Sequence, residues 1–317
     1  MNILALLQCI QPTVGKTSVG QLSKIIIAML AMTGRVTMLG ISRWAGKGGS
    51  YRTVQRFFSQ AIPWEKVFWE FFSQHLHQPG DEYILVGDES TITKAGKHTH
   101  GLDYFFSSSL GRAVKSIAIF ALSVVNVRER RSYPTMVRQV VRTQAEKDAA
   151  KERSKQRKSK KDKSAKPKRK PGRPKGSKNR DKTQVEWTPE LLRIKAMVQE
   201  QLSIIQGIIA IKHLALDGHF GNNNALQMTL QCGLHLISKL RYDAALYFPY
   251  EGPYAGKGPY RKYGNKIDYH HIPHKYLVET SLDGDIETRI YQAQMLHKDF
   301  AQPLNVVIIT KTNRKNG

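Results

Sequence analysis

Cysteine and long apolar runs are both scarce in this sequence. Only Cys9 and Cys232 occur among its 317 residues, which excludes a disulfide framework or a cysteine-based zinc site and favours a reducing, cytoplasmic setting. No uninterrupted apolar stretch approaches the roughly 18 residues of a membrane span, so we expect no membrane partner. With 40% hydrophobic residues, the chain is instead long enough for two or three globular domains.

Acidic residues are scarce as well. The sequence has 25 Asp and Glu against 50 Lys and Arg, which gives a formal net charge of +25. Residues 151–180 hold 16 Lys and Arg and two acids, so this segment contributes +14 and the rest of the chain +11. Because the remainder is basic in its own right, the charge predicts a polyanionic partner, with nucleic acid favoured over a merely solvated charged tail.

Two apolar segments each lead into an aspartate. Residues 83–86 have strand-forming character and are followed by Gly87 and Asp88, and residues 208–216 are followed by Asp217. If the two strands lie side by side, the pair of carboxylates can hold Mg²⁺ or Mn²⁺ for phosphodiester chemistry. Strand alternation turns Glu89 to the opposite face, so we expect it to lie outside this site. An aspartate at a strand end is also common as a turn or cap residue, and that alternative stays open.

The first part of the chain predicts helices. Apolar residues recur at helical spacing within 16–34, a second helix is expected over 38–45, and Ser50 can cap a third helix that carries Arg52 and Arg56 on one face. This pattern is typical of a helix-turn-helix with a basic recognition helix. A small helical bundle with solvated arginines fits the same residues about as well.

Further basic residues are candidate DNA contacts. Residues 145–182 lack apolar periodicity, so we expect them to be disordered. Within them, the Gly-Arg-Pro sequence around Arg173 resembles an AT-hook, whose arginine enters the minor groove of A·T tracts. Outside the two arginines of the third helix, the candidate DNA-binding residues are Lys94, Lys97, Arg173, Lys175, Lys257 and Arg261.

Several short motifs together resemble a DDE transposase of a bacterial insertion sequence. They are Gly87-Asp88-x-Ser-Thr-Ile followed by Lys94-x-Gly96-Lys97, the stretch from Gly101 to Ser109-x-Gly111, the basic Gly-Arg-Pro segment, and Asp217-Gly-x-Phe-Gly-Asn222. The resemblance covers nearly the whole chain. It implies an α/β, ribonuclease-H-like mixed sheet, with a helical N-terminal DNA-binding domain and a β-rich insertion.

The resemblance also implies a division of the chain and a set of partners. Asp88 and Asp217 would be catalytic residues that ligate Mg²⁺ or Mn²⁺. The partners would be double-stranded DNA, as terminal inverted repeats and as target, and a second copy of the chain on that DNA, in a nucleoid-associated, cytoplasmic setting. The expected parts are a DNA-binding domain (1–79), a first catalytic part (80–144), a disordered basic linker (145–182), a second catalytic part (183–241), a β-rich insertion (242–303) and the start of a final catalytic part (304–317).

One element of the family pattern is missing. Such enzymes carry a third acid in a Tyr-x-x-Arg-x-x-x-Glu motif on a late helix, and the sequence contains no such motif. We therefore expect a chain that is truncated before the third acid, binds DNA and is inactive in transposition. The alternatives are a non-catalytic DNA-binding repressor of the intact transposase and a ribonuclease-H-like nuclease.

Overall fold

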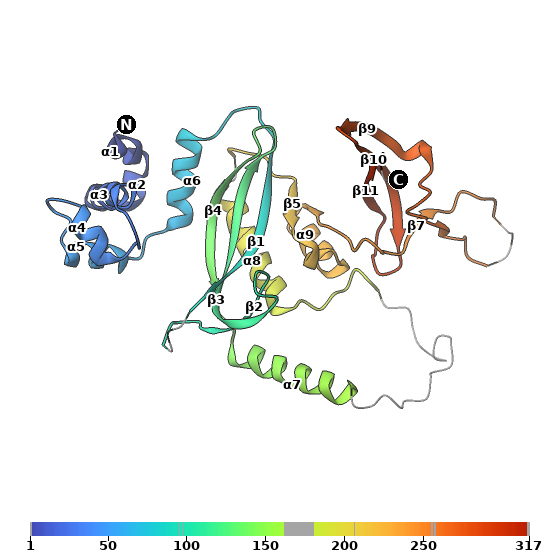
Figure 1. Ribbon diagram of the computed structural model, residues 1–317, viewed down its shortest axis with the longest axis horizontal. Coiled ribbons are helices and arrows are strands. Elements are labelled where there is room, and N and C mark those ends of the chain that lie inside the picture. Colours follow the sequence, from blue (N-terminus) through green and yellow to red (C-terminus); the bar gives the residue numbers. More distant parts are fainter. Residues whose placement is uncertain are drawn as a thin grey trace. The chain divides into compact units, whose positions relative to one another are not determined.

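The computed structural model describes residues 2–94, 96, 98–161, 181–205, 207–254, 256 and 258–315 (Figure 1). The chain divides into two units. The first contains Met1–Lys166, Thr188–Leu216 and Thr229–Ile237, and the second contains Pro167–Trp187, Asp217–Met228 and Ser238–Gly317.

A six-stranded mixed sheet forms the centre of the first unit. Three strands run antiparallel in the order β4-β3-β1, and β5 and β6 follow in parallel on the other side of β1. The short β2 pairs with the first residues of β3. This arrangement confirms the predicted ribonuclease-H-like α/β fold. The strands are β1 (Tyr83–Thr93), β2 (Asp103–Ser107), β3 (Arg112–Asn126), β4 (Arg131–Val140), β5 (His213–Leu216) and β6 (His235–Ile237).

The two faces of this sheet differ in burial because side chains alternate along each strand. Leu85 and Gly87 of β1 are buried and pair with Val124 and Leu122 of β3, which are buried too. Helix α8 (Pro189–Ile205) covers this face with a stripe of buried residues that includes Ile194, Met197 and Val198. The opposite face, which carries Asp88, is more exposed.

Seven helical segments precede the sheet. Ile25 of α3, Ile41 of α4 and Phe57 of α5 share one buried cluster, so these three predicted helices pack together. Both alternatives, a helix-turn-helix and a small helical bundle, stay open. Helix α6 joins these helices to the sheet through Phe72, whose ring centroid lies 5.8 Å from that of Tyr83. The segments are α1 (Ile3–Leu6), the 3-10 helix η1 (Leu7–Ile10), α2 (Gln11–Val14), α3 (Lys16–Ala31), α4 (Met38–Trp44), α5 (Tyr51–Phe58) and α6 (Trp64–His75).

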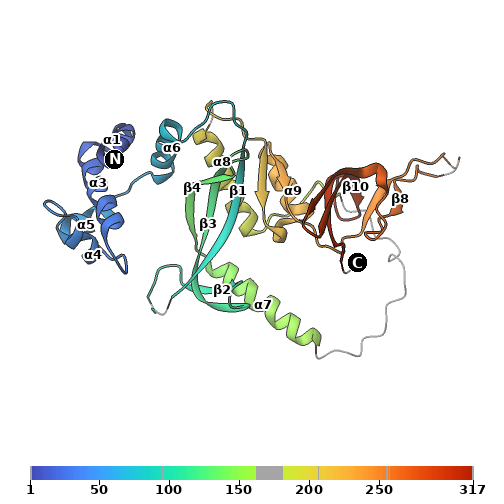
Figure 2. The same cartoon turned by 45° about the horizontal axis from the view of Figure 1, so that its top comes forward.

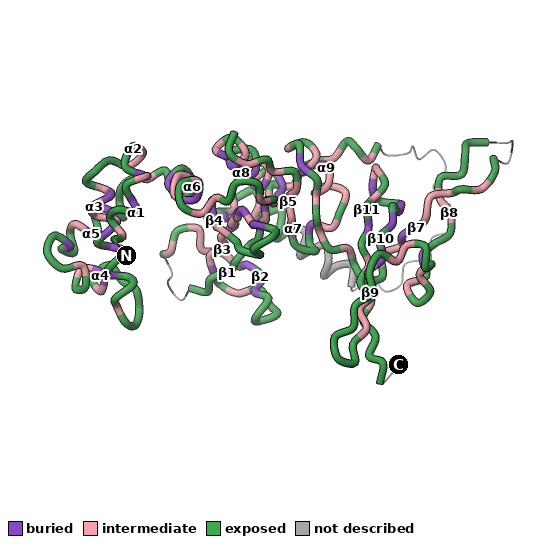
Figure 3. Tube along the Cα trace, turned by 90° about the horizontal axis from the view of Figure 1, so that it is seen from above, coloured by how far each residue is buried: buried purple, intermediate pink, exposed green. Residues whose placement is uncertain are grey.

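The second unit has its own five-stranded sheet, with β11-β10-β7-β8 in order and β9 also paired with β10 (Figure 2). The buried residues of this sheet lie along β7, β10 and β11 and, as Ile267, directly after β8 (Figure 3). Two short 3-10 helices and helix α9 also belong, in whole or in part, to this unit. The elements are η2 (Gly218–Phe220), α9 (Asn223–Gln231, shared with the first unit), β7 (Leu246–Pro249), β8 (Tyr263–Lys266), η3 (His274–Tyr276), β9 (Leu277–Asp283), β10 (Ile286–His297) and β11 (Leu304–Asn313).

Strand β11 corrects one prediction. The sequence assigned 304–317 to the final part of the catalytic domain, but β11 pairs antiparallel with β10 from Met295↔Leu304 to Ile286↔Asn313. Val306 joins the buried cluster of this second sheet. The pairing is favoured because only a short connection separates the two strands, so little chain entropy is lost in closing it.

Helix α7 (Gln144–Lys161) corrects a second prediction, because disorder was expected from residue 145. Ala, Glu, Gln, Lys and Arg make up most of this segment, and all five are strong helix formers. Two ion pairs within the helix add to this propensity. Lys151 Nζ lies 3.5 Å from Asp148 Oδ1, and Lys155 Nζ lies 3.0 Å from Glu152 Oε1. The prediction is therefore wrong for 145–161, and residues 162–180 lie outside the described residues.

Gly87 occupies a position where a side chain does not fit. A Cβ atom there would lie 2.8 Å from Leu216 Cδ2 and 2.8 Å from Phe120 Cζ, and both neighbours are buried. We expect Gly87→Val to lower the free energy of unfolding by about 1–3 kcal/mol through overpacking. Urea denaturation measures this, with Ala113→Val at an exposed position of β3 as the matched control. An equal effect of the two substitutions would contradict the prediction.

Candidate functional site

Asp88 lies on the more exposed face of the central sheet. The sequence predicted that its strand ends here, whereas β1 continues to Thr93 because the long β3 offers it pairing partners as far as Ser116. Asp88 itself is exposed and opposite Ala121 of β3. Its Oδ1 accepts a hydrogen bond from the Glu89 backbone N–H at 2.9 Å. The rest of the carboxylate is therefore open to a ligand from solvent.

Asp217 directly follows β5 and begins the short helix η2. Its Oδ1 accepts a hydrogen bond from the His219 backbone N–H at 3.2 Å, and its carbonyl oxygen accepts one from the Ser238 hydroxyl at 2.6 Å. Asp217 is exposed. Part of its role is thus the cap that the sequence left open as an alternative, but one hydrogen bond leaves most of the carboxylate's acceptor capacity unused.

The two aspartates lie in or directly after neighbouring strands, because β1 pairs with β5. The strands are parallel, with Leu85 opposite Leu214, Val86 opposite Ala215 and Gly87 opposite Leu216. The residue after the last pair is an aspartate in both strands.

Glu89 belongs to the other face of the sheet, as predicted. It lines a cavity of about 170 Å³ between the sheet and α8, together with Phe120, Arg138 and Met197. Arg138 forms two ion pairs there, because its Nη2 lies 2.6 Å from Glu200 Oε1 and 3.4 Å from Glu65 Oε1. The neighbouring acids Asp88 and Glu89 therefore have separate surroundings, and only Asp88 faces the candidate site.

The ligand chemistry fits a divalent cation such as Mg²⁺ or Mn²⁺. Asp88 and Asp217 offer carboxylate oxygens, which are the hard ligands that these ions take. Within the described ranges, no group of three or more His, Cys, Asp or Glu side chains is placed to hold a metal ion. The shared metal site of Asp88 and Asp217 stays a prediction.

Arg52 and Arg56 both lie exposed on α5, one helical turn apart. The Ser50 hydroxyl caps this helix by accepting a hydrogen bond from the Thr53 backbone N–H at 3.3 Å, as predicted. On the inner side of the helix, Phe57 is only 2% exposed and fixes its orientation. The helix thus presents a basic outer face on a well-packed support.

Of the other candidate DNA-binding residues, two lie within the part of the chain that the structure describes. Lys94 is exposed and directly follows β1, and its backbone N–H donates to the Lys115 carbonyl at 3.2 Å. Arg261 is exposed, and its guanidinium carbon lies 4.9 Å from the centroid of the Tyr250 ring. The remaining four candidates, Lys97, Arg173, Lys175 and Lys257, lie outside the described residues.

Sequence reasoning missed two features around these residues. Tyr250, Tyr254 and Tyr260 form a ring cluster beside Arg261, and only the loop's basic and aromatic composition hinted at it. The start of α7 was also missed, although Thr143-Gln-Ala-Glu146 has the spacing of a capping box. That signal was available from the sequence alone.

A comparison with protein families adds to this geometry. A family model described as "DDE superfamily endonuclease" matches residues 6–298 of the 317. No curated protein matches the chain. Among the helices of the described residues, none has both the length and the apolar character needed to cross a membrane.

Proposed function

Because the chain belongs to the DDE superfamily of endonucleases, we propose that it is a transposase, which binds the ends of an insertion sequence and performs metal-dependent strand cleavage and transfer. Its family makes it a nuclease-type enzyme with a DNA substrate. The observation that carries the finer proposal is the parallel pairing of β1 with β5, which stops one residue before Asp88 and one before Asp217.

Asp88 and Asp217 are proposed to hold the divalent cation. A bound Mg²⁺ or Mn²⁺ supplies a positive charge that stabilises the phosphodiester oxygens during in-line displacement. The backbone around the two acids supports this role, since β1 and β5 are ordered by the buried face beneath them. The carboxylates themselves stay accessible to DNA.

DNA recognition is assigned to different parts of the chain. Arg52 and Arg56 on α5 are proposed to read the terminal repeat, as the second helix of a helix-turn-helix does. Lys94, close to Asp88 in sequence, and Arg261 are proposed to contact phosphates. Target DNA and a second copy of the chain complete the proposed assembly, in a cytoplasmic, nucleoid-associated setting.

A DNA-binding regulator is the second candidate. The observation that favours it is the exposed basic face of α5, which serves a repressor as well as a transposase. A nuclease without end recognition is a third, which the family itself allows.

One experiment separates these candidates. The purified full chain is incubated with a supercoiled plasmid that carries both ends of the element, with Mg²⁺, Mn²⁺ or EDTA. Family membership and the pair Asp88 and Asp217 predict metal-dependent cleavage at the element ends and joining of those ends to target DNA. The missing Tyr-x-x-Arg-x-x-x-Glu motif predicts binding to the ends without either step. Binding to the ends without cleavage would favour the regulator, and cleavage without preference for the ends would favour the nuclease.

A further inference from the structure

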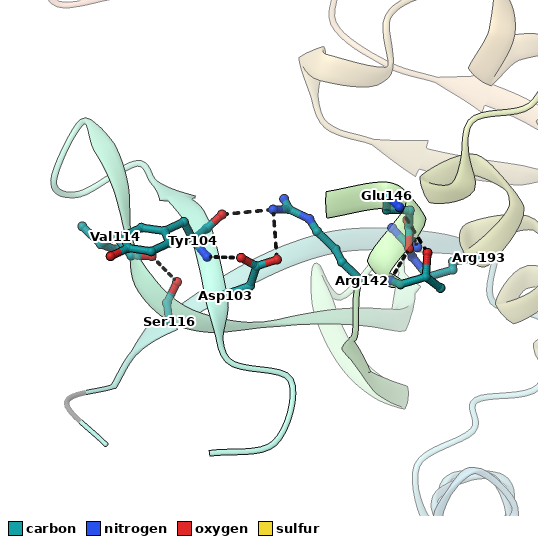
Figure 4. A network of polar contacts seen from close by, with 8 residues as sticks. Asp103, Tyr104, Val114, Ser116, Arg142, Glu146 and Arg193 are labelled. Atoms are coloured by element: carbon teal, nitrogen blue, oxygen red, sulfur yellow. Dashed lines mark hydrogen bonds and ion pairs between the residues drawn. The ribbon is translucent and has the colours of Figure 1, made fainter. Parts of the chain in front are cut away.

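The first turn of α7 is held firmly to the rest of its unit. The Thr143 backbone N–H donates to Glu146 Oε2 at 2.7 Å, and the Glu146 backbone N–H donates back to Thr143 Oγ1 at 3.3 Å. Glu146 also binds Arg193 of α8, with Nη1 and Oε1 2.5 Å apart (Figure 4). Its side chain is only 14% exposed. Burial raises the pKa of this carboxyl, but the hydrogen bonds from Arg193 and Thr143 outweigh that effect and leave the pKa below its ordinary value.

Arg142 makes a second attachment, on the residue just before this capping box (Figure 4). Its Nη1 donates to the Tyr104 carbonyl at 3.0 Å and lies 3.7 Å from Asp103 Oδ2. The guanidinium carbon also lies 4.2 Å from the centroid of the Phe105 ring. The start of α7 is thus tied to β2 on one side and to α8 on the other.

The remainder of α7 carries charge and almost no apolar surface. Its three acids are Glu146, Asp148 and Glu152, all in the first half of the helix. From residue 153 to residue 161, six of nine residues are Lys or Arg and none is acidic. Lys151 and Lys155 have side chains that are 69% and 75% exposed. Alanines are its only apolar residues, so no hydrophobic stripe points to a protein partner.

Two anchors at one end of a basic helix have a physical consequence. A free basic tail binds phosphate but loses conformational entropy when it does so. Anchoring the helix beforehand lowers that loss and gives its charges one direction relative to the sheet. A segment that served only for solubility would gain nothing from such attachments.

We propose that α7 is a DNA-contacting arm, which Arg142 fixes to β2 and Glu146 fixes to α8, so that its lysines and arginines hold the phosphate backbone of bound duplex. The proposal rests on the proposed function, because the ligand is the same DNA. Glu146 and Arg193 act as positioning residues. The arm itself supplies the counterion release that makes binding depend on salt.

Two opposite changes of charge test the anchor. Glu146→Gln makes the chain more positive and keeps a residue that serves a capping box, whereas Arg193→Gln makes it less positive. Fluorescence anisotropy with an element-end duplex in EDTA measures affinity without any contribution from catalysis. We expect both variants to bind about five- to tenfold more weakly, since both release the arm and add its ordering cost to binding. The double variant should be no weaker than the single ones, because one ion pair is lost in each case.

Asp148→Asn is the matched control. It adds the same charge to the same helix, and the bonds that Asp148 makes among the described residues go to Gln144 and Lys151 of α7. We expect it to bind DNA as tightly as the native chain or more tightly. If Glu146→Gln matched Asp148→Asn, binding would follow net charge alone and the proposal would be overturned. If the native chain did not cleave at the element ends, but Glu146→Gln and Arg193→Gln still bound DNA more weakly, only the proposed function would be rejected.

Discussion

Asp88→Asn is expected to lower metal-dependent DNA cleavage by on the order of a thousandfold, because the neutral amide no longer attracts a divalent cation. Asparagine has nearly the shape of aspartate, and the side chain is exposed, so strand β1 should form as before. Asp217→Asn should cause a similar loss. The double variant should be little worse than either single variant, since residues that act as one unit are strongly non-additive.

The control for this prediction is Glu82→Gln. Glu82 is exposed and directly precedes β1, so the substitution removes the same charge far from the end of the β1–β5 pairing. We expect it to leave cleavage unchanged. Affinity for DNA in EDTA should not fall in any of these variants, because the removed charges repel phosphate. Cleavage that survives in either aspartate variant would contradict the shared site.

Joint replacement of Arg52 and Arg56 by alanine is expected to weaken binding to element-end DNA by on the order of a hundredfold, because each good contact between arginine and a base edge contributes about 1–3 kcal/mol. Binding to unrelated DNA should fall much less. The fold of the bundle should survive, since both side chains are exposed and the buried Val54 and Phe57 are untouched. Competition binding with an element-end duplex and an unrelated duplex measures the ratio of the two affinities directly.

A second pair of residues serves as the control for the recognition helix. Arg43 on α4 and Lys47 in the turn are also exposed, so their joint replacement removes the same charge from the same bundle. If these two contact only phosphates, affinity should fall equally for both duplexes. If the Arg52/Arg56 variant behaved in the same way, α5 would be a phosphate-binding helix and would not read sequence.

The elements of the central sheet were predictable from sequence because they are locally encoded. Apolar residues before Asp88 and Asp217 indicate strands, and alternation alone places Glu89 on the other face. Which residue of β1 lies opposite Leu216 was not predictable, because a register depends on contacts between segments far apart in the chain. That register was nevertheless the decisive fact about the candidate site.

The errors at residues 145–161 and 304–313 have physical causes of the same kind. For residues 145–161, high charge was given more weight than helix propensity and than the capping box that begins at Thr143. For residues 304–313, an apolar strand was assigned to the wrong sheet, because its sequence does not specify its partner strand, and Val306 is buried in the second sheet. Composition and periodicity identify an element, but the partner of that element depends on long-range packing.

The place of α8 in the chain has a consequence for biosynthesis. The sheet face around Leu85 and Leu122 can form once β4 ends at Val140, but its cover begins only at Pro189. At the ribosome's rate, the intervening 48 residues take roughly 2–10 s to add. During that interval the nascent sheet exposes its apolar face to other chains. The segment that emerges during this interval is strongly basic. Repulsion between these segments on neighbouring nascent chains should slow the association of the chains until α8 is made.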